Sequence, residues 1–181
     1  MFVVGLTGYP LSGKDTVAEY FVEKGFVLLS GGNMIREAMR NEGLPADREN
    51  IQAYVRKMRV QHGDAYLVEL MLPLINGGTV ISAFREIAGV ELMKKTFSEE
   101  FVLLNVSAPI DVRYNRAQLR QREGDKISIE DFKRLEDIEC NSEGYSMDHV
   151  VAAADMTIQN NGTKKELYFQ LDQLFKKSLH V

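Results

Sequence analysis

Two glycines and a lysine near the start of the chain are spaced as in a loop that binds phosphate. Four residues separate Gly8 from Gly13, and Lys14 follows directly. Backbone N–H groups of such a loop can turn toward a phosphate, and a helix starting there directs its positive dipole end at the same anion. Lys14 adds a mobile positive charge. The spacing therefore predicts a nucleotide-phosphate site, the alternative being an ordinary glycine-rich turn between a strand and a helix.

The residue after the lysine departs from the usual pattern. Asp15 stands where a Ser or Thr hydroxyl normally reaches a magnesium ion, and Thr16 comes one step later. This departure points away from GTPases and motor ATPases and toward small-molecule kinases. The chain also lacks the Asn-Lys-x-Asp motif that reads guanine.

Two further arginines could form a second anion site. Arg36 lies in a segment, residues 30–36, that follows a predicted strand and enters a predicted helix, and Arg85 follows the next predicted strand. Converging guanidinium groups can bind a phosphate with paired hydrogen bonds. These residues could therefore hold the phosphate of an acceptor molecule, although two solvated surface arginines are the alternative.

Arginines are also concentrated in one predicted helix, over residues 110–122. Helical spacing places the first three on a shared face. A segment at this point of a phosphate-binding domain can close over the phosphates as a lid, while a solvated helix face is the alternative. These arginines are Arg113, Arg116, Arg120 and Arg122, and Arg134 on the next predicted helix could join them.

Alternating strands and helices must position these side chains. Apolar runs without polar alternation predict parallel strands covered on both faces. The order of the elements predicts an α/β fold of three layers around a five-stranded parallel sheet, with the ligand at the carboxyl ends of the strands, near Gly8, Ser82 and Ser107. The strands are expected at residues 2–6, 26–30, 79–82, 101–106 and 156–159. The helices are expected at 16–24, 31–43, after an N-cap at Asp47 and through residues 51–59, within 64–75 with an end near Pro73, at 86–97, 110–122, 128–138, up to 154, and from 163 onward.

The composition limits the classes of partner. The chain has 181 residues, a formal net charge of −4 and a single cysteine, Cys140. A mildly acidic chain is a poor general binder of nucleic acid, and one cysteine cannot build a disulfide framework. No apolar stretch is long enough for a membrane span. We expect one domain over residues 1–181, cytoplasmic, without nucleic-acid or membrane partners, as a monomer or homodimer.

Five segments carry a resemblance to a known family: GYPLSGKDT, SGGNMIR, ISAFR, DVRYNRAQLRQR and ADMTIQNNGTKKEL. They resemble the nucleoside monophosphate kinase branch of the P-loop kinases, most closely its archaeal-type adenylate-kinase-related proteins, with dephospho-CoA kinases as cousins. The resemblance covers nearly the whole chain. It implies a P-loop NTPase fold with a small helical lid.

The resemblance also implies a role for each site residue. Acceptor-binding helices would span about residues 31–75 and the lid about 113–138. The ATP phosphates would contact Gly8, Ser12, Gly13, Lys14, Asp15 and Thr16. Catalysis would depend on Lys14, Arg116, Arg120 and Arg122, the acceptor would contact Asn33, Arg36 and Arg85, and the adenine would be flanked by Asn160, Gly162 and Thr163.

Two departures from the family concern carboxylates. Ser82 stands where the family has an Asp that holds Mg²⁺ through water, and Asn33 replaces the Asp of the acceptor segment. We expect Asp15 to compensate and to share the Mg²⁺ with Ser82. The resulting prediction is an ATP- and Mg²⁺-dependent kinase acting on a nucleoside or deoxynucleoside monophosphate. The alternatives are a dephospho-CoA kinase and a regulatory protein that binds ATP without turnover.

Overall fold

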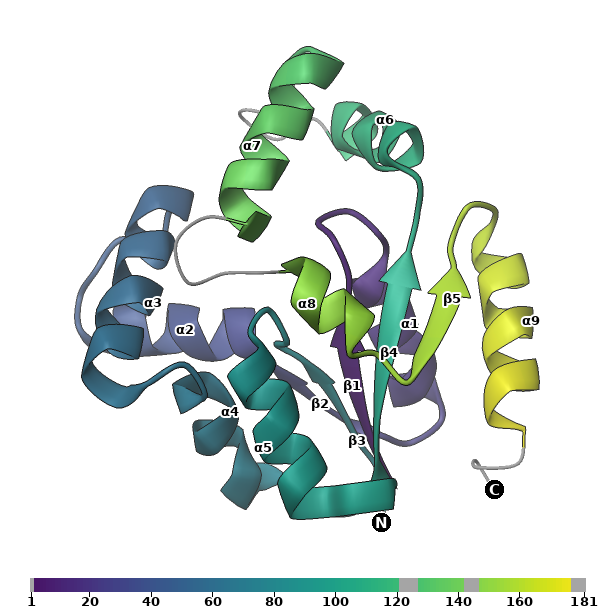
Figure 1. The fold of residues 1–181 in the computed structure, drawn as a ribbon, viewed down its shortest axis with the longest axis horizontal. Coiled ribbons are helices and arrows are strands. Elements are labelled where there is room, and N and C mark those ends of the chain that lie inside the picture. Colours follow the sequence, from purple (N-terminus) through teal and green to yellow (C-terminus); the bar gives the residue numbers. More distant parts are fainter. Residues whose placement is uncertain (1, 121–126, 142–146, 177–181) are drawn as a thin grey trace.

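A five-stranded parallel sheet forms the centre of the molecule (Figure 1). The structure is a computed structural model that describes residues 2–120, 127–141 and 147–176. The strands run in the order β2-β3-β1-β4-β5, and each neighbouring pair is parallel. They are β1 (Val3–Thr7), β2 (Val27–Ser30), β3 (Thr79–Ser82), β4 (Phe101–Ser107) and β5 (Met156–Gln159). The predicted α/β class and sheet are confirmed.

Helices cover both faces of this sheet. Val4, Leu6 and Leu104 are buried with residues of α1 (Lys14–Glu23) and α9 (Lys164–Phe175) on one face. The alternate strand residues, Val3 and Leu103 among them, are buried on the other face with α4 (Tyr66–Met71), α5 (Ile87–Phe97) and α8 (Met147–Ala152). Because both faces are buried, the strands have continuous apolar sequences.

The remaining helices stand at the carboxyl ends of the strands (Figure 1). They are α2 (Gly31–Asn41), α3 (Arg48–His62), α6 (Ile110–Arg120) and α7 (Ile129–Asn141), while single-turn helices η1 (Leu72–Leu74) and η2 (Ser98–Glu100) lie in the connections. Side chains cap several helix starts: Ser30 accepts from the Asn33 N–H, Asp47 from the Asn50 N–H, and Thr163 forms a capping box with Glu166. Such caps satisfy backbone donors that the helix leaves unpaired.

One sequence-based expectation about burial was wrong. The strand expected to be buried at residues 26–30 is β2, which lies at the sheet edge and leaves Val27 47% and Leu28 40% exposed. The core helix expected within residues 64–75, ending near Pro73, is α4, which buries Val68 and Met71 and is followed by η1 with Pro73. Among the described residues, no helix is long and apolar enough to cross a membrane.

Candidate nucleotide and acceptor site

The loop between β1 and α1 can exist only with glycine at two positions. Gly8 has φ 134°, and a Cβ there would lie 2.3 Å from the Val106 carbonyl oxygen. Gly13 has φ 98°, and a Cβ there would lie 2.0 Å from Asn160 Nδ2. Leu11, between them, also has a positive φ of 62°. The loop is therefore wrapped tightly against β4 and the segment after β5, in a backbone shape that stores strain as functional loops often do.

Lys14 begins α1 and folds back over this loop. Its Nζ donates to the carbonyl oxygens of Gly8 at 2.6 Å and Tyr9 at 2.8 Å. The loop thus holds the Lys14 ammonium group near the N-terminus of α1. A helix N-terminus favours an anion, so both the ammonium group and the helix dipole would attract a phosphate. The spacing of Gly8, Gly13 and Lys14 thus corresponds to a strand-loop-helix turn with the lysine folded onto the loop.

Arg116 supports the loop from α6. Its Nη1 donates to the Leu11 and Ser12 carbonyls at 3.1 and 3.2 Å, and its Nη2 donates to the Asn160 carbonyl at 2.8 Å. Asn160 Nδ2 in turn donates to the Ser12 carbonyl at 2.8 Å. Burial lowers the pKa of Arg116. In this conformation Arg116 positions the loop and shares the Ser12 carbonyl with Asn160.

Arg113 also reaches the loop, because its Nη1 lies 3.4 Å from the Pro10 carbonyl oxygen, but its environment differs from that of Arg116. It is buried, forms an ion pair with Glu136 of α7 and donates from Nε to the Ala108 carbonyl at 2.9 Å. Its guanidinium lies 5.1 Å from the centre of the Tyr9 ring, and burial lowers its pKa. Arg113 therefore joins α6 to α7 and to the loop instead of facing a ligand.

One cleft of about 1190 Å³ connects the phosphate loop with α2 and α3. It brings together eight of the predicted site residues, which are Gly8, Lys14, Asp15, Asn33, Arg36, Ser82, Arg85 and Arg120. The other predicted site residues that the structure describes do not line it: Ser12, Gly13, Thr16, Arg116, Asn160, Gly162 and Thr163. Ser107 is not part of the lining either. Arg122 lies outside the described residues.

The part of the cleft where the acceptor is expected to bind also contains a charged cluster that was not predicted from the sequence. Arg59 of α3 donates from Nε and Nη2 to Asp64 Oδ1 at 2.9 and 2.7 Å, and its Nη1 lies 3.4 Å from Glu86 Oε1. All three residues line the cleft. Burial raises the pKa of Glu86 to about 7, against a smaller opposing effect of Arg59. Glu86 is distant in the sequence from Arg59 and Asp64, so no spacing signal marks the cluster.

The magnesium prediction rests on two residues that share this cleft. Asp15 and Ser82 both line it. Within residues 2–120, 127–141 and 147–176, no group of three or more His, Cys, Asp or Glu side chains could hold a metal ion. Mg²⁺ in kinases is commonly held by one or two carboxylates together with the substrate phosphates, so a single carboxylate and a hydroxyl fit such an ion only with a nucleotide present.

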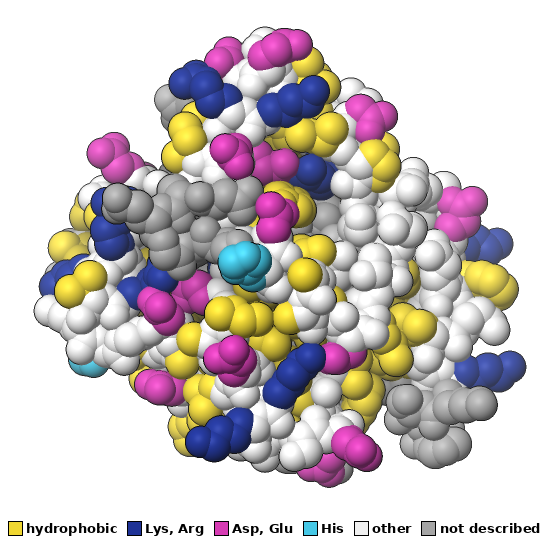
Figure 2. Space-filling model, viewed as in Figure 1, with side chains coloured by type: hydrophobic (Ala, Val, Ile, Leu, Met, Phe, Trp, Pro, Cys, Tyr) yellow, Lys and Arg dark blue, Asp and Glu magenta, His cyan; other side chains and the backbone are white. Residues whose placement is uncertain are grey.

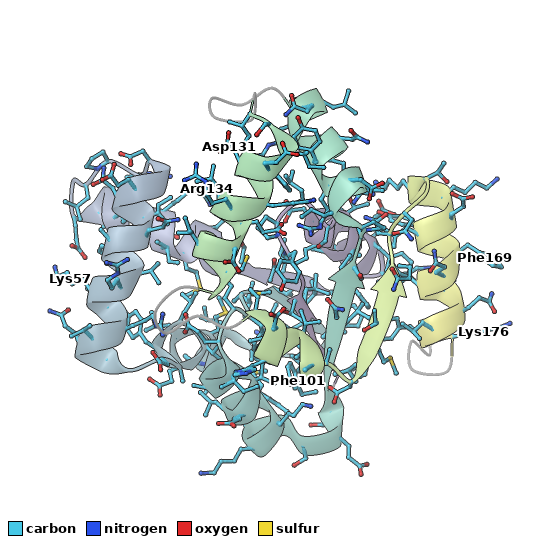
Figure 3. All side chains as sticks on the ribbon, turned by 45° about the horizontal axis from the view of Figure 1, so that its top comes forward. Lys57, Phe101, Asp131, Arg134, Phe169 and Lys176 are labelled. Carbon is cyan, nitrogen blue, oxygen red and sulfur yellow. The ribbon has the colours of Figure 1, made fainter. Side chains whose placement is uncertain are left out.

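Arg134 does not join the site. It lies on the side of α7 toward α3 (Figure 3), is 66% exposed and pairs with Asp131 at 2.9 Å. Charges of both signs are interspersed over the face seen in Figure 2. Positive groups of the predicted site that do line the cleft include Lys14, Arg36 and Arg85.

This sheet order, with the loop at the end of its central strand, defines the fold of the P-loop kinases, and the comparisons agree. The fold is similar to shikimate kinase from Aquifex aeolicus, with a TM-score of 0.59 and 15% identity over 97% of this chain and 96% of that one. It is also similar to the APS kinase of Mycobacterium tuberculosis, solved in complex with AMPPNP and APS, with a TM-score of 0.55 and 16% identity over 97% and 98% of the chains.

The sequence comparisons identify the family of the chain. The profile described as "AAA domain" matches residues 4–142. A UPF0200 protein of Halobacterium salinarum is 30% identical over 88% of this chain and 85% of the relative. The chain therefore belongs to the AAA domain family and to the UPF0200 proteins. A UPF0200/UPF0201 protein of Archaeoglobus fulgidus is 32% identical over 98% of this chain, which spans 56% of that relative.

Proposed function

We propose that the protein transfers the γ-phosphoryl group of ATP to a small acceptor that carries a phosphate, with a nucleoside or deoxynucleoside monophosphate as the first candidate. One observation carries the proposal: a single cleft is lined by Lys14 of the phosphate loop and by Arg36 and Arg85, which come from separate elements. Cationic groups from the phosphate loop and from two other elements in one cleft suit a donor and an acceptor held in line.

Each group of cleft residues would have its own role in the transfer. Lys14 and the loop N–H groups would hold the β- and γ-phosphates of ATP, and Arg120 would neutralise charge that spreads over the transferring group. Mg²⁺ would be held by Asp15, by Ser82 through water and by the ATP phosphates, and when bound it supplies charge neutralisation at the phosphates. Helices α2 to α4 would form the acceptor side, and α6 with α7 the lid.

The resemblance to adenylate-kinase-related proteins also supports sites for the base and the acceptor phosphate. Asn160, Gly162 and Thr163 would flank the adenine, where Asn160 already contacts the loop and Thr163 caps α9. Arg36 and Arg85 would clamp the acceptor phosphate, with Asn33 nearby. A dephospho-CoA kinase would use the same adenine-flanking segment and differs in taking a hydroxyl as its acceptor group.

A second candidate of another class is an ATP-binding regulatory protein without turnover. The observation in its favour is the cleft lining at the end of β3, where Ser82 supplies a hydroxyl instead of a carboxylate. Loss of a carboxylate beside Mg²⁺ removes electrostatic stabilisation from the transfer step. The side chains of the acceptor half favour the enzyme, because a protein that only senses ATP has no need of a second anion site.

The test is γ-phosphoryl transfer from ATP with Mg²⁺ to a panel of nucleoside monophosphates, deoxynucleoside monophosphates and dephospho-CoA. Lys14→Ala should abolish transfer. Lys24→Ala is the matched control, because Lys24 lies just beyond the other end of α1, where it pairs with Asp172, and should leave transfer unchanged. ATP binding without transfer to any acceptor would favour the regulatory protein.

A further inference from the structure

Glu86 occupies a position for which its side chain is poorly suited structurally. It is the residue preceding α5, with extended backbone angles of φ −135° and ψ 142°, and its side chain makes no capping hydrogen bond. Ser, Thr, Asp and Asn are favoured there because their short side chains accept a bond from the first turn. Glu86 reaches toward Arg59 of α3 instead. The Glu86 side chain is therefore not used as a hydrogen-bonding cap, and such local exceptions occur at functional sites.

The Glu86 carboxylate is enclosed but only loosely paired. Its side chain is 17% exposed and that of Arg59 12%. Arg59 gives its two short hydrogen bonds to Asp64, while its Nη1 stays 3.4 Å from Glu86 Oε1, beyond the range of about 2.7–2.9 Å for charge-assisted bonds. Burial also raises the pKa of Glu86 to about 7, as expected for a carboxylate with little compensation. Glu86 therefore retains hydrogen-bonding capacity inside the cleft.

The surroundings of Glu86 limit what can bind to it. The cleft near α3 and α4 is lined by the apolar side chains of Met58 and Leu67 and the ring of Tyr66. An acceptor with its phosphate on Arg36 and Arg85 would extend along this wall. A second anionic group next to Glu86 would be repelled, and an apolar group would leave a buried carboxylate without a partner, which is costly. A neutral group that donates a hydrogen bond avoids both costs.

We propose that Glu86 selects the acceptor by accepting a hydrogen bond from a neutral N–H or O–H group of it, at a fixed distance from the acceptor phosphate. The inference rests on the proposed function, since it assumes that the acceptor phosphate binds Arg36 and Arg85. A nucleoside monophosphate offers such a donor in two places, the N–H groups of its base and the hydroxyl groups of its sugar.

The experiment compares wild type, Glu86→Ala, Glu86→Gln and Glu91→Ala in steady-state transfer from ATP to the best acceptor of the panel. Glu91 is the matched control, because it is an exposed glutamate on the same helix. Loss of a hydrogen bond to a charged group should lower kcat/KM for the acceptor by roughly 10- to 100-fold in Glu86→Ala, mostly through KM, and leave KM for ATP unchanged. Glu86→Gln keeps the shape of the side chain and serves as the variant that should still fold if Glu86→Ala does not.

Acceptor analogues then identify the donor group. A 2′-deoxy analogue removes a sugar hydroxyl, and a base analogue without an exocyclic amine removes an N–H. For wild type, kcat/KM should fall by the same factor, roughly 10- to 100-fold, with one of these analogues. For Glu86→Ala, kcat/KM should be the same with that analogue as with the parent acceptor. An unchanged KM for the acceptor in Glu86→Ala, or equal rises for acceptor and ATP, would overturn the inference.

Failure of the proposed function is separable from failure of this inference. If wild type transfers no phosphoryl group, calorimetric binding of the same monophosphates replaces the kinetic readout. Binding that weakens by a similar factor in Glu86→Ala would then support Glu86 as the acceptor-reading residue even without turnover. Equal binding to both proteins, or no binding to wild type, would refute it.

Discussion

Replacing Glu86 with Gln should stabilise the protein at alkaline pH and not at acidic pH. Burial raises the pKa of Glu86 to about 7 in the folded protein, above its ordinary value of 4.5. The folded state therefore holds this proton more tightly than the unfolded state, so the contribution of Glu86 to stability is fully present below pH 4.5 and is lost as the pH rises through 7. Gln has no such titration.

The size of the effect follows from the two pKa values. The separation of 4.5 and about 7 corresponds to a loss of up to about 3 kcal/mol at high pH, of which about 2.5 kcal/mol falls between pH 5 and pH 8. The difference in unfolding free energy between Glu86→Gln and wild type should grow by that amount over this interval. With a urea dependence of about 2 kcal/mol per M, the midpoints should separate by about 1 M more at pH 8 than at pH 5.

Urea unfolding followed by circular dichroism at pH 5, 6, 7 and 8 measures this difference. Glu91→Gln is the control and should follow wild type at every pH, because Glu91 is exposed. A difference between Glu86→Gln and wild type that stays constant from pH 5 to pH 8 would refute the reasoning that the carboxylate is buried without full compensation.

Four further substitutions test other parts of the structure. Gly13→Ala should lower the unfolding free energy by at least about 1–2 kcal/mol and abolish ATP binding, because a left-handed backbone disfavours a Cβ and Asn160 blocks it; calorimetry showing normal ATP affinity would contradict this. Arg113→Ala should cost about 3–5 kcal/mol in urea unfolding, because it leaves the Glu136 charge buried and unpaired. Arg134→Ala, at an exposed pair, should leave the urea midpoint unchanged, and equal midpoints for the two arginine variants would refute the contrast. Ser82→Asp should raise Mg²⁺-dependent transfer by at least about tenfold if the missing carboxylate limits the rate, and an unchanged rate with ATP still bound would favour the regulatory protein.

Local sequence patterns were sufficient to predict most of the fold. The expected strands at residues 79–82 and 156–159 match β3 and β5, because short apolar runs between turn residues leave few other choices. Asp47 caps α3 as expected from its residue type. The exposure of β2 was not predictable in this way, since whether a strand is central or at the edge depends on strand order, which is a long-range property.

The same division applies to the site. The loop itself was predictable because its glycines and lysine are close in the sequence, whereas its contacts with Arg116 and Asn160 are long-range and were not. Helical spacing placed Arg113 and Arg116 on one side of a helix. It could not reveal that Arg113 forms an ion pair with Glu136 of α7, or that Arg116 donates hydrogen bonds to the loop carbonyls. The Arg59 and Glu86 pair joins residues from α3 and the start of α5, and no periodicity connects such positions.

The most direct test of the central claim is transfer of the terminal phosphoryl group of radiolabelled ATP to a nucleoside monophosphate with Mg²⁺. Wild type and Lys24→Ala should label one acceptor of the panel, and Lys14→Ala should label none, because Lys14 is the charged group that the phosphate loop holds at the cleft. Equal labelling by Lys14→Ala, or binding of ATP by wild type without labelling of any acceptor, would contradict the account.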